Sequence, residues 1–166
     1  MAATVTIRVY TGAPAGVQSA AQTGISFLSI DSALTTPASR TANPVVAGGR
    51  SYEKWMVARV DVAPPNWVNN FYAWGDGVVM ADTVLYVGNN VAYVQPTDAA
   101  SGIAVNDWTN YVVGGKWTWH TAGGGDANLV NIGDITNYLV MQLAPAAAHA
   151  GGAWTQEVIN YEYAEA

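Results

Sequence analysis

The sequence Ser51-Tyr-Glu-Lys-Trp-Met-Val-Ala-Arg-Val-Asp-Val62 decides the fold class of this chain. Over residues 55–62 its side chains alternate with a period of two, the repeat of a strand that buries one face. One face carries Met56, Ala58, Val60 and Val62, and the other carries Trp55, Val57, Arg59 and Asp61. Two similar runs follow, Asn69-Asn-Phe-Tyr-Ala-Trp74 and Thr83-Val-Leu-Tyr-Val87, separated by Pro and Gly residues. The stretch therefore predicts three successive strands.

Strand-like runs recur along the rest of the chain. Strands are expected at residues 4–10, 25–30, 55–62, 68–74, 83–87, 135–143 and 158–163, and residues 91–94 should continue or pair with the fifth of these. Residues 111–113 and 116–119 flank Gly114-Gly115 and predict a hairpin with a tight glycine turn. About eight strands without a long amphipathic helix predict an all-β protein. We expect a single domain over residues 1–166, an antiparallel β-sandwich of jelly-roll or immunoglobulin-like kind with long loops.

Residues 31–50 form the longest stretch without a strand pattern. They contain Pro37, Pro44, Gly48 and Gly49 among small polar residues. A loop of about twenty residues is unusual inside a compact domain and often has a function. We expect an extended surface loop or arm here, which together with the amino-terminal strand would attach the protein to a partner.

The composition limits the partners. Six Lys and Arg against twelve Asp and Glu give a net charge of −6, which disfavours nucleic acid. No run approaches the length of about 18 apolar residues that a membrane helix needs. The first residues lack the basic start and apolar core of a signal peptide, which favours synthesis in the cytoplasm. The absence of cysteine excludes disulfides and thiolate chemistry.

Aromatic residues and the scarcity of charge indicate contact surfaces. Only 11% of residues are charged, against about 25% in typical domains. Uncharged polar residues could fill the exterior, but seven Trp and nine Tyr favour burial against other subunits, because interfaces are rich in such rings. Homo-oligomerisation is one expected consequence. The candidate interface residues are Trp67, Trp74, Trp108, Trp117, Trp119, Trp154, Arg40 and Arg50.

No pattern in the sequence predicts an enzyme, a cofactor or a metal site. Glycoside hydrolysis needs two carboxylates about 5–10 Å apart, but the acidic residues are better explained by turns and solvated positions. The only histidines, His120 and His149, are not accompanied by a Gly-x-Ser-x-Gly elbow. Gly123-Gly-Gly-Asp126 lacks the Lys-Ser/Thr of a phosphate loop. Loop residues Asp98, Asp107, Asp126 and Asp134 do not have the spacing of a calcium loop.

The order of these segments resembles that of small structural proteins of bacteriophage virions. The resemblance covers most of the chain and is carried by strand patterns. The matching segments are Thr4-Val-Thr-Ile-Arg-Val-Tyr10, Gly49-Arg-Ser-Tyr-Glu-Lys-Trp55, Asn69-Asn-Phe-Tyr-Ala-Trp74, Thr83-Val-Leu-Tyr-Val-Gly88, Ala92-Tyr-Val-Gln-Pro-Thr97, Tyr138-Leu-Val-Met-Gln-Leu143 and Gln156-Glu-Val-Ile-Asn-Tyr-Glu-Tyr163. The resemblance implies a non-enzymatic β-sandwich that decorates the phage head. It transfers no binding residue, and the low charge and the Ala-rich residues 145–153 depart from the pattern.

The sequence therefore leads to one hypothesis and two alternatives. We expect a virion protein, made in the host cytoplasm, that binds and stabilises the lattice of the major capsid protein. A tail or baseplate component is an alternative of the same class. A carbohydrate-binding adhesion module is an alternative of a different class, because exposed Trp rings can stack on sugars.

Overall fold

The computed structural model describes residues 2–119, 127–150 and 158–166 and has two antiparallel sheets. The larger sheet has the order β2 (Val17–Gln18), β1 (Thr4–Thr11), β3 (Lys54–Val62), β8 (Tyr138–Pro145), β5 (Thr83–Asn90) and β6 (Asn106–Asp107). The smaller sheet has the order β7 (Trp117–Thr118), β4 (Val68–Trp74) and β9 (Asn160–Glu165). The helical elements are α1 (Pro37–Ala42) and the 3₁₀ turn η1 (Trp108–Asn110). The predicted β-sandwich is confirmed, with nine strands in the described part of the chain.

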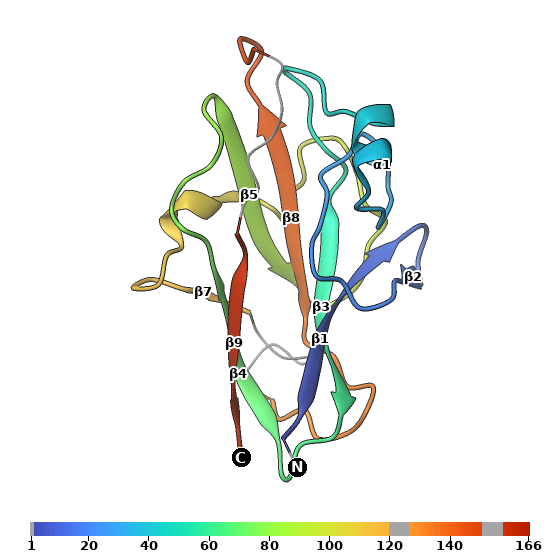
Figure 1. Cartoon of the computed structure of the whole chain (residues 1–166), viewed down its shortest axis with the longest axis vertical. Helices are drawn as coiled ribbons and strands as arrows, with labels where there is room; N and C mark the ends of the chain where they lie inside the picture. Colours follow the sequence, from blue (N-terminus) through green and yellow to red (C-terminus); the bar gives the residue numbers. More distant parts are fainter. Residues whose placement is uncertain (1, 120–126, 151–157) are drawn as a thin grey trace.

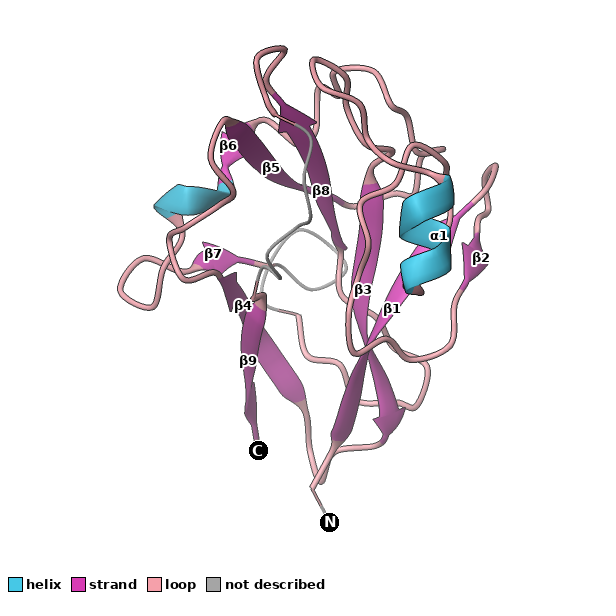
Figure 2. Cartoon of the chain, turned by 45° about the horizontal axis from the view of Figure 1, so that its top comes forward, coloured by secondary structure: helices cyan, strands magenta, loops and turns pink. Residues whose placement is uncertain are grey.

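The chain crosses between the two sheets repeatedly. β3 lies in the larger sheet, β4 in the smaller sheet and β5 again in the larger one, and β8 and β9 make the same crossing. Figure 2 shows β7, β4 and β9 together on one side, with the larger sheet curving round the other. The main core lies between the layers, and its largest members are Met56, Phe71, Leu85, Trp108, Trp119, Leu139, Met141 and Leu143.

The alternation expected for β3 is confirmed, but this strand is buried on both faces over much of its length. Met56 faces the main core, whereas Trp55 and Val57 belong to a second buried cluster and have no exposed surface. In that cluster Trp55 packs against Tyr93 and Tyr138, with ring centroids 5.3 and 5.6 Å apart. Loops thus pack on the outer face of the larger sheet. The alternating sequence pattern predicts one buried face and does not predict that this second face is buried as well.

Two expected strands do not form. Residues 25–30 run irregularly, although Leu28 is fully buried and its carbonyl accepts a hydrogen bond from Tyr52 N at 2.9 Å. Residues 91–94 are also irregular, whereas β5 extends to Asn90. Residues 26 and 28 are buried without joining a sheet, whereas Val91 and Val94 are 65% and 48% exposed, so an apolar run alone indicates neither a strand nor burial.

Residues 31–50 do not form an extended arm, because they fold back on the sandwich. Within them α1 begins after Thr36, whose hydroxyl accepts a hydrogen bond from Ser39 N at 3.1 Å. The segment is fastened at its far end by Gly48 N, which donates to the carbonyl of Pro145 at 3.1 Å. In Figure 1 α1 lies beside the upper part of the larger sheet. No helix in the described ranges has the length and apolarity required to cross a bilayer.

The amino-terminal strand is part of the sandwich as well. Residues 4–10 of β1 pair along β3, and Val5 and Val9 are buried in the main core. The amino-terminal strand cannot be detached as an attachment element without opening the core. The two expected attachment elements are therefore both parts of the folded body rather than free extensions.

Candidate protein-binding surface

The best candidate for a binding surface lies at the β7 edge of the smaller sheet. β7 pairs with β4, with Thr118 opposite Tyr72 and Trp117 opposite Ala73. The predicted hairpin between residues 111–113 and 116–119 is therefore wrong, because β4 provides the partner that the residues before Gly114 were expected to supply. Gly114 and Gly115 also do not have the positive φ angles of the expected turn. Instead, Gly115 N donates to the Val112 carbonyl at 2.8 Å.

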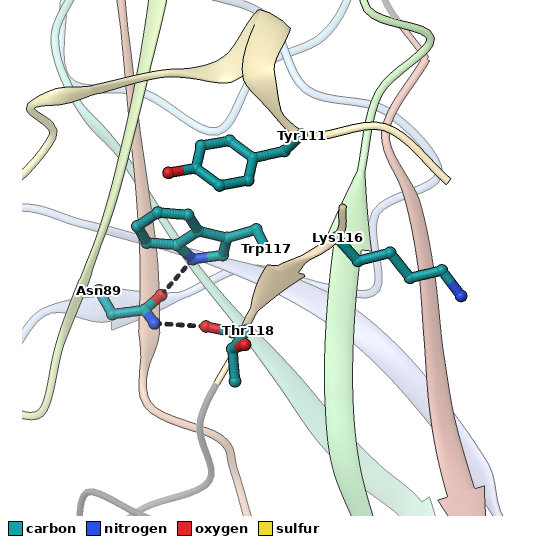
Figure 3. A pocket seen from close by; sticks show the side chains of 5 residues that line it. All are labelled: Asn89, Tyr111, Lys116, Trp117 and Thr118. Atoms are coloured by element: carbon teal, nitrogen blue, oxygen red, sulfur yellow. Dashed lines mark hydrogen bonds between the residues drawn. The ribbon is translucent and has the colours of Figure 1, made fainter. Parts of the chain in front are cut away.

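A pocket of about 290 Å³ opens beside β7, and Figure 3 shows its walls. The rings of Tyr111 and Trp117 meet edge to face, with centroids 4.7 Å apart and planes at 84°. The indole Nε1 of Trp117 donates to Asn89 Oδ1 at 2.8 Å, and Asn89 Nδ2 donates to the carbonyl of Thr118 at 2.7 Å. Asn89 comes from β5, so one amide side chain fastens the edge of the smaller sheet to the larger sheet.

The outward face of the same edge carries one ion pair over an aromatic ring. Lys116 Nζ lies 4.4 Å from the ring centroid of Trp74 and 2.5 Å from Glu162 Oε1. The Lys116 side chain is about one quarter exposed and that of Glu162 is 45% exposed, so the pair is only partly desolvated. In Figure 3 Lys116 points away from Tyr111 and Trp117, which leaves the two rings without a charged neighbour among the residues drawn.

Two loop tips extend the apolar surface beside these rings. Gly75 N donates to the Tyr111 carbonyl at 2.9 Å, which holds the loop after β4 against the loop after η1. A Cβ on Gly77 would lie 2.9 Å from Val112 Cγ1, so these loops touch. At their tips Val78 and Val113 are 67% and 71% exposed. We call Trp74, Val78, Tyr111, Val113 and Trp117 together the aromatic edge; Tyr111 and Trp117 pack against the main core on the inner face of the sheet, and Trp74 lies on its outer face.

The structure separates the tryptophans proposed from the sequence. Trp74 and Trp117 are half-buried and belong to the aromatic edge. Trp108 and Trp119 are 2% and 1% exposed, so they are core residues and cannot anchor a partner. Trp67 is half-buried at the far end of β4, where its backbone pairs with residue 166. Trp154 lies outside the described residues.

The two candidate arginines lie apart from the aromatic edge. Arg40 is exposed on α1 and donates to the carbonyl of Thr35 at 2.5 Å. Arg50 lies 4.9 Å above the ring of Tyr86, donates to Gln142 Oε1 at 3.1 Å and lines a second pocket of about 610 Å³. Among the described residues neither arginine has a carboxylate within 4.0 Å, so both charges are available to a partner.

The acidic residues considered for catalysis or metal binding do not gather into a site. Within the described ranges no three His, Cys, Asp or Glu side chains are placed to hold one metal ion. Asp107 accepts from Thr109 N at the start of η1, and Asp134 accepts from the backbone of residues 130 and 131. Asp134 lies in a turn, as expected, whereas Asp107 ends β6 and caps η1. His120, Asp126 and Glu157 lie outside the described residues.

Two ionisable side chains are buried at the start of β3. Lys54 is 1% exposed, and its Nζ donates to the Ser32 carbonyl at 2.7 Å. Burial lowers its pKa to about 8, against a smaller opposing effect of Asp31. Glu53 is 2% exposed, and its Oε2 accepts from Trp55 Nε1 at 2.9 Å. Neither Lys54 nor Glu53 lines either of the two pockets described above.

Sequence reasoning missed most of the non-tryptophan members of this surface. The sequence pattern placed Tyr111, Val113 and Lys116 in a hairpin and gave Val78 and Asn89 no binding role. Their importance depends on β7 pairing with β4 and on β5 crossing behind it, which are long-range contacts. The available signal was the density of aromatic residues in Trp108-Thr-Asn-Tyr111 and Trp117-Thr-Trp119.

Comparison of the chain with protein-family models, curated proteins and solved structures found no match.

Proposed function

We propose that this chain is a non-enzymatic structural protein of a bacteriophage virion, a head decoration protein that binds the major capsid protein and stabilises its lattice. The observation that supports this proposal best is the aromatic edge. Val78 and Val113 are more than two-thirds exposed beside half-buried Trp and Tyr rings. Exposed apolar side chains beside aromatic rings are typical of the centre of a protein interface, and here Asp76 and the Lys116–Glu162 pair lie next to them.

The proposed mechanism is the bridging of neighbouring shell subunits. Burial of apolar surface contributes about 25 cal/mol per Å² before the cost of association is subtracted. A single small contact is therefore weak, but many identical copies on one lattice stabilise the shell together. The rigid sandwich holds the aromatic edge in place, because Asn89 links Trp117 and Thr118 to the larger sheet. Little ordering of the edge is then required when it binds.

The geometry favours protein over carbohydrate as the partner. A sugar-binding platform presents open ring faces beside polar groups. Here the Lys116 ammonium lies over Trp74, and the rings of Tyr111 and Trp117 are nearly perpendicular to each other. Covered and crossed rings suit packing against apolar side chains better than stacking on a flat sugar ring.

A matched pair of substitutions tests the surface. Val113→Asp places a carboxylate on the aromatic edge, and Val17→Asp places one on β2 at the opposite side of the molecule. The two valines are 71% and 70% exposed, so both variants should fold equally well. We expect Val113→Asp to reduce cosedimentation with capsid shells at least tenfold and Val17→Asp to leave it unchanged. Equal binding by both variants would remove the aromatic edge from the proposal.

Binding to different targets, compared in the same assay, tests the identity of the partner. Purified heads and purified tails of the same phage should be compared directly, because a tail component would bind only the latter. Insoluble polysaccharide from the host surface serves as the glycan control. Saturable binding to heads alone supports the proposal, whereas binding to tails or to polysaccharide contradicts it.

A further inference from the structure

The carboxyl-proximal strand β9 is a long open edge. It ends the order of the smaller sheet and pairs with β4 along one side. In the described part of the chain no strand pairs with its other side, and Figure 1 shows β9 at the front of the molecule. The other terminal strands, β2, β6 and β7, have two residues each, whereas β9 has six. An open edge of this length presents a row of backbone donors and acceptors to a further strand.

β9 lacks two of the usual protections against edge pairing, basic side chains and Pro, although it carries two Glu and its pairing with β4 is irregular between Asn69 and Tyr72. Its sequence, Asn160-Tyr-Glu-Tyr-Ala-Glu165, contains no Lys, Arg or Pro. Its two carboxylates are already engaged by the chain itself. Glu162 accepts from Lys116 Nζ at 2.5 Å, and Glu165 accepts from Ala3 N at 2.6 Å. The edge is therefore open to strand pairing, without a free charge directed at an incoming strand.

We propose that β9 pairs antiparallel with β9 of a second copy of this chain, so that two three-stranded sheets become one continuous sheet of six. The two-fold axis passes through Tyr163. Tyr163 lies on the inner face, where its ring stacks on Phe71 with centroids 5.4 Å apart. Tyr161 lies on the same face and is 39% exposed, so it offers apolar surface to the incoming strand.

The charge pattern selects this register. In an antiparallel pair of identical strands, opposed residues lie on the same face of the sheet. An axis at Glu162 would place two Glu162 carboxylates opposite each other, which destabilises a strand pair. An axis at Tyr163 places Glu162 opposite Ala164 of the second copy and Tyr161 opposite Glu165 of the second copy. This register pairs residues 161–165 of the two copies and brings no two carboxylates face to face.

The inference goes beyond the proposed binding to capsid shells and does not depend on it. β7 and β9 are the two opposite ends of the smaller sheet, so pairing through β9 leaves the aromatic edge at β7 accessible. A dimer of this kind carries two aromatic edges. If it also binds a shell, the two edges act together and raise the overall affinity.

Single cysteines test the register, because the chain contains none of its own. Tyr163→Cys places one thiol on the axis, where the two copies bring their Cα atoms within the distance that a disulfide spans. Tyr161→Cys places a more exposed thiol on the same face, four residues from its counterpart. Under mild oxidation we expect at least fivefold more covalent dimer from Tyr163→Cys. Equal cross-linking of the two variants, or none in either, would overturn the proposal.

A second experiment does not disturb the stacking of Tyr163. Ala164→Glu places a carboxylate opposite Glu162 of the second copy, and Ala164→Lys places an ammonium there. Sedimentation equilibrium should show dimers of the unmodified chain and at least tenfold weaker dimerisation of Ala164→Glu than of Ala164→Lys. A monomeric unmodified chain at several hundred micromolar, or equal dimerisation of the two variants, would contradict the pairing. Shell binding is measured separately, so failure of one proposal leaves the other testable.

Discussion

Replacement of the buried Lys54 by methionine should change how the stability of this protein depends on pH. The Lys54 ammonium has one hydrogen-bond acceptor, the Ser32 carbonyl, and almost no exposed surface. Burial penalises its charged form more than the nearby Asp31 favours it, and the pKa falls from 10.5 to about 8. Methionine has a similar length and no charge, so the variant removes this titration and retains most of the packing.

The size of the effect follows from the two pKa values of Lys54. Between about 8 and 10.5 the unfolded chain binds a proton that the folded chain has released, so stability rises with pH in this window. Each pH unit contributes at most about 1.4 kcal/mol. From about pH 7 to pH 10 the unmodified protein should therefore gain about 2 kcal/mol relative to Lys54→Met. The lost hydrogen bond to Ser32 adds an offset that does not change with pH.

Urea unfolding followed by tryptophan fluorescence measures this difference. Burial also raises the pKa of Tyr138 to about 12 and raises that of Tyr93, which destabilises the fold above about pH 10. Both tyrosines are present in the two proteins, so their contribution cancels in the comparison. A difference in unfolding free energy that stays constant with pH, or that moves against the unmodified protein as pH rises, would refute the assignment of Lys54 as a buried, destabilised ammonium.

Three further substitutions test other parts of the structure by the same unfolding assay. Asn89→Ala removes both hydrogen bonds that fasten β7 and should cost about 1–3 kcal/mol, whereas Asn90→Ala, which loses two exposed local hydrogen bonds, should cost less than about 1 kcal/mol. Gly88→Ala drives a Cβ into the carbonyl of an adjacent loop and should cost about 3 kcal/mol or more, whereas Gly114→Ala has open space and should be tolerated. Hydrogen bonds and neighbouring arginines lower the pKa of Asp61, so its contribution is lost as pH falls below about 3.8. Asp61→Asn should flatten this acid dependence by less than about 1 kcal/mol, because ion pairs near the surface contribute little. Equal losses of stability for Asn89→Ala and Asn90→Ala, or for Gly88→Ala and Gly114→Ala, would contradict these contacts. An unfolding free energy that depends on acid pH in the same way with and without Asp61→Asn would contradict the role given to Asp61.

The strands that follow a strong alternating pattern could be predicted from the sequence. β4 begins and ends at the predicted residues, and β3 and β1 differ from their predictions by one residue at one end. In these strands the inward positions are apolar and the ends are marked by Pro, Gly or polar residues. The period of two reports directly which residues face the core, as Met56 and Leu139 illustrate.

The pairing partners and the loops could not be predicted in the same way. β7 has two residues, and its position is fixed by β4 and Asn89 rather than by its own sequence. Leu28 is buried by an irregular segment that hydrogen-bonds to Tyr52, so an apolar run there does not indicate a strand. Trp108, Trp117 and Trp119 all lie in similar aromatic-rich stretches of sequence. Trp108 and Trp119 are buried and Trp117 is not, and only the tertiary fold determines this difference.

Binding of the purified chain to phage heads tests the central claim most directly. The chain should be titrated against heads assembled from the major capsid protein of the same phage, with tails and host polysaccharide in parallel, and the bound fraction read by cosedimentation. We expect saturable binding to heads at a fixed ratio to capsid subunits. Val113→Asp should lose this binding and Val17→Asp should retain it. Absence of binding to heads, or binding confined to tails or polysaccharide, would contradict it.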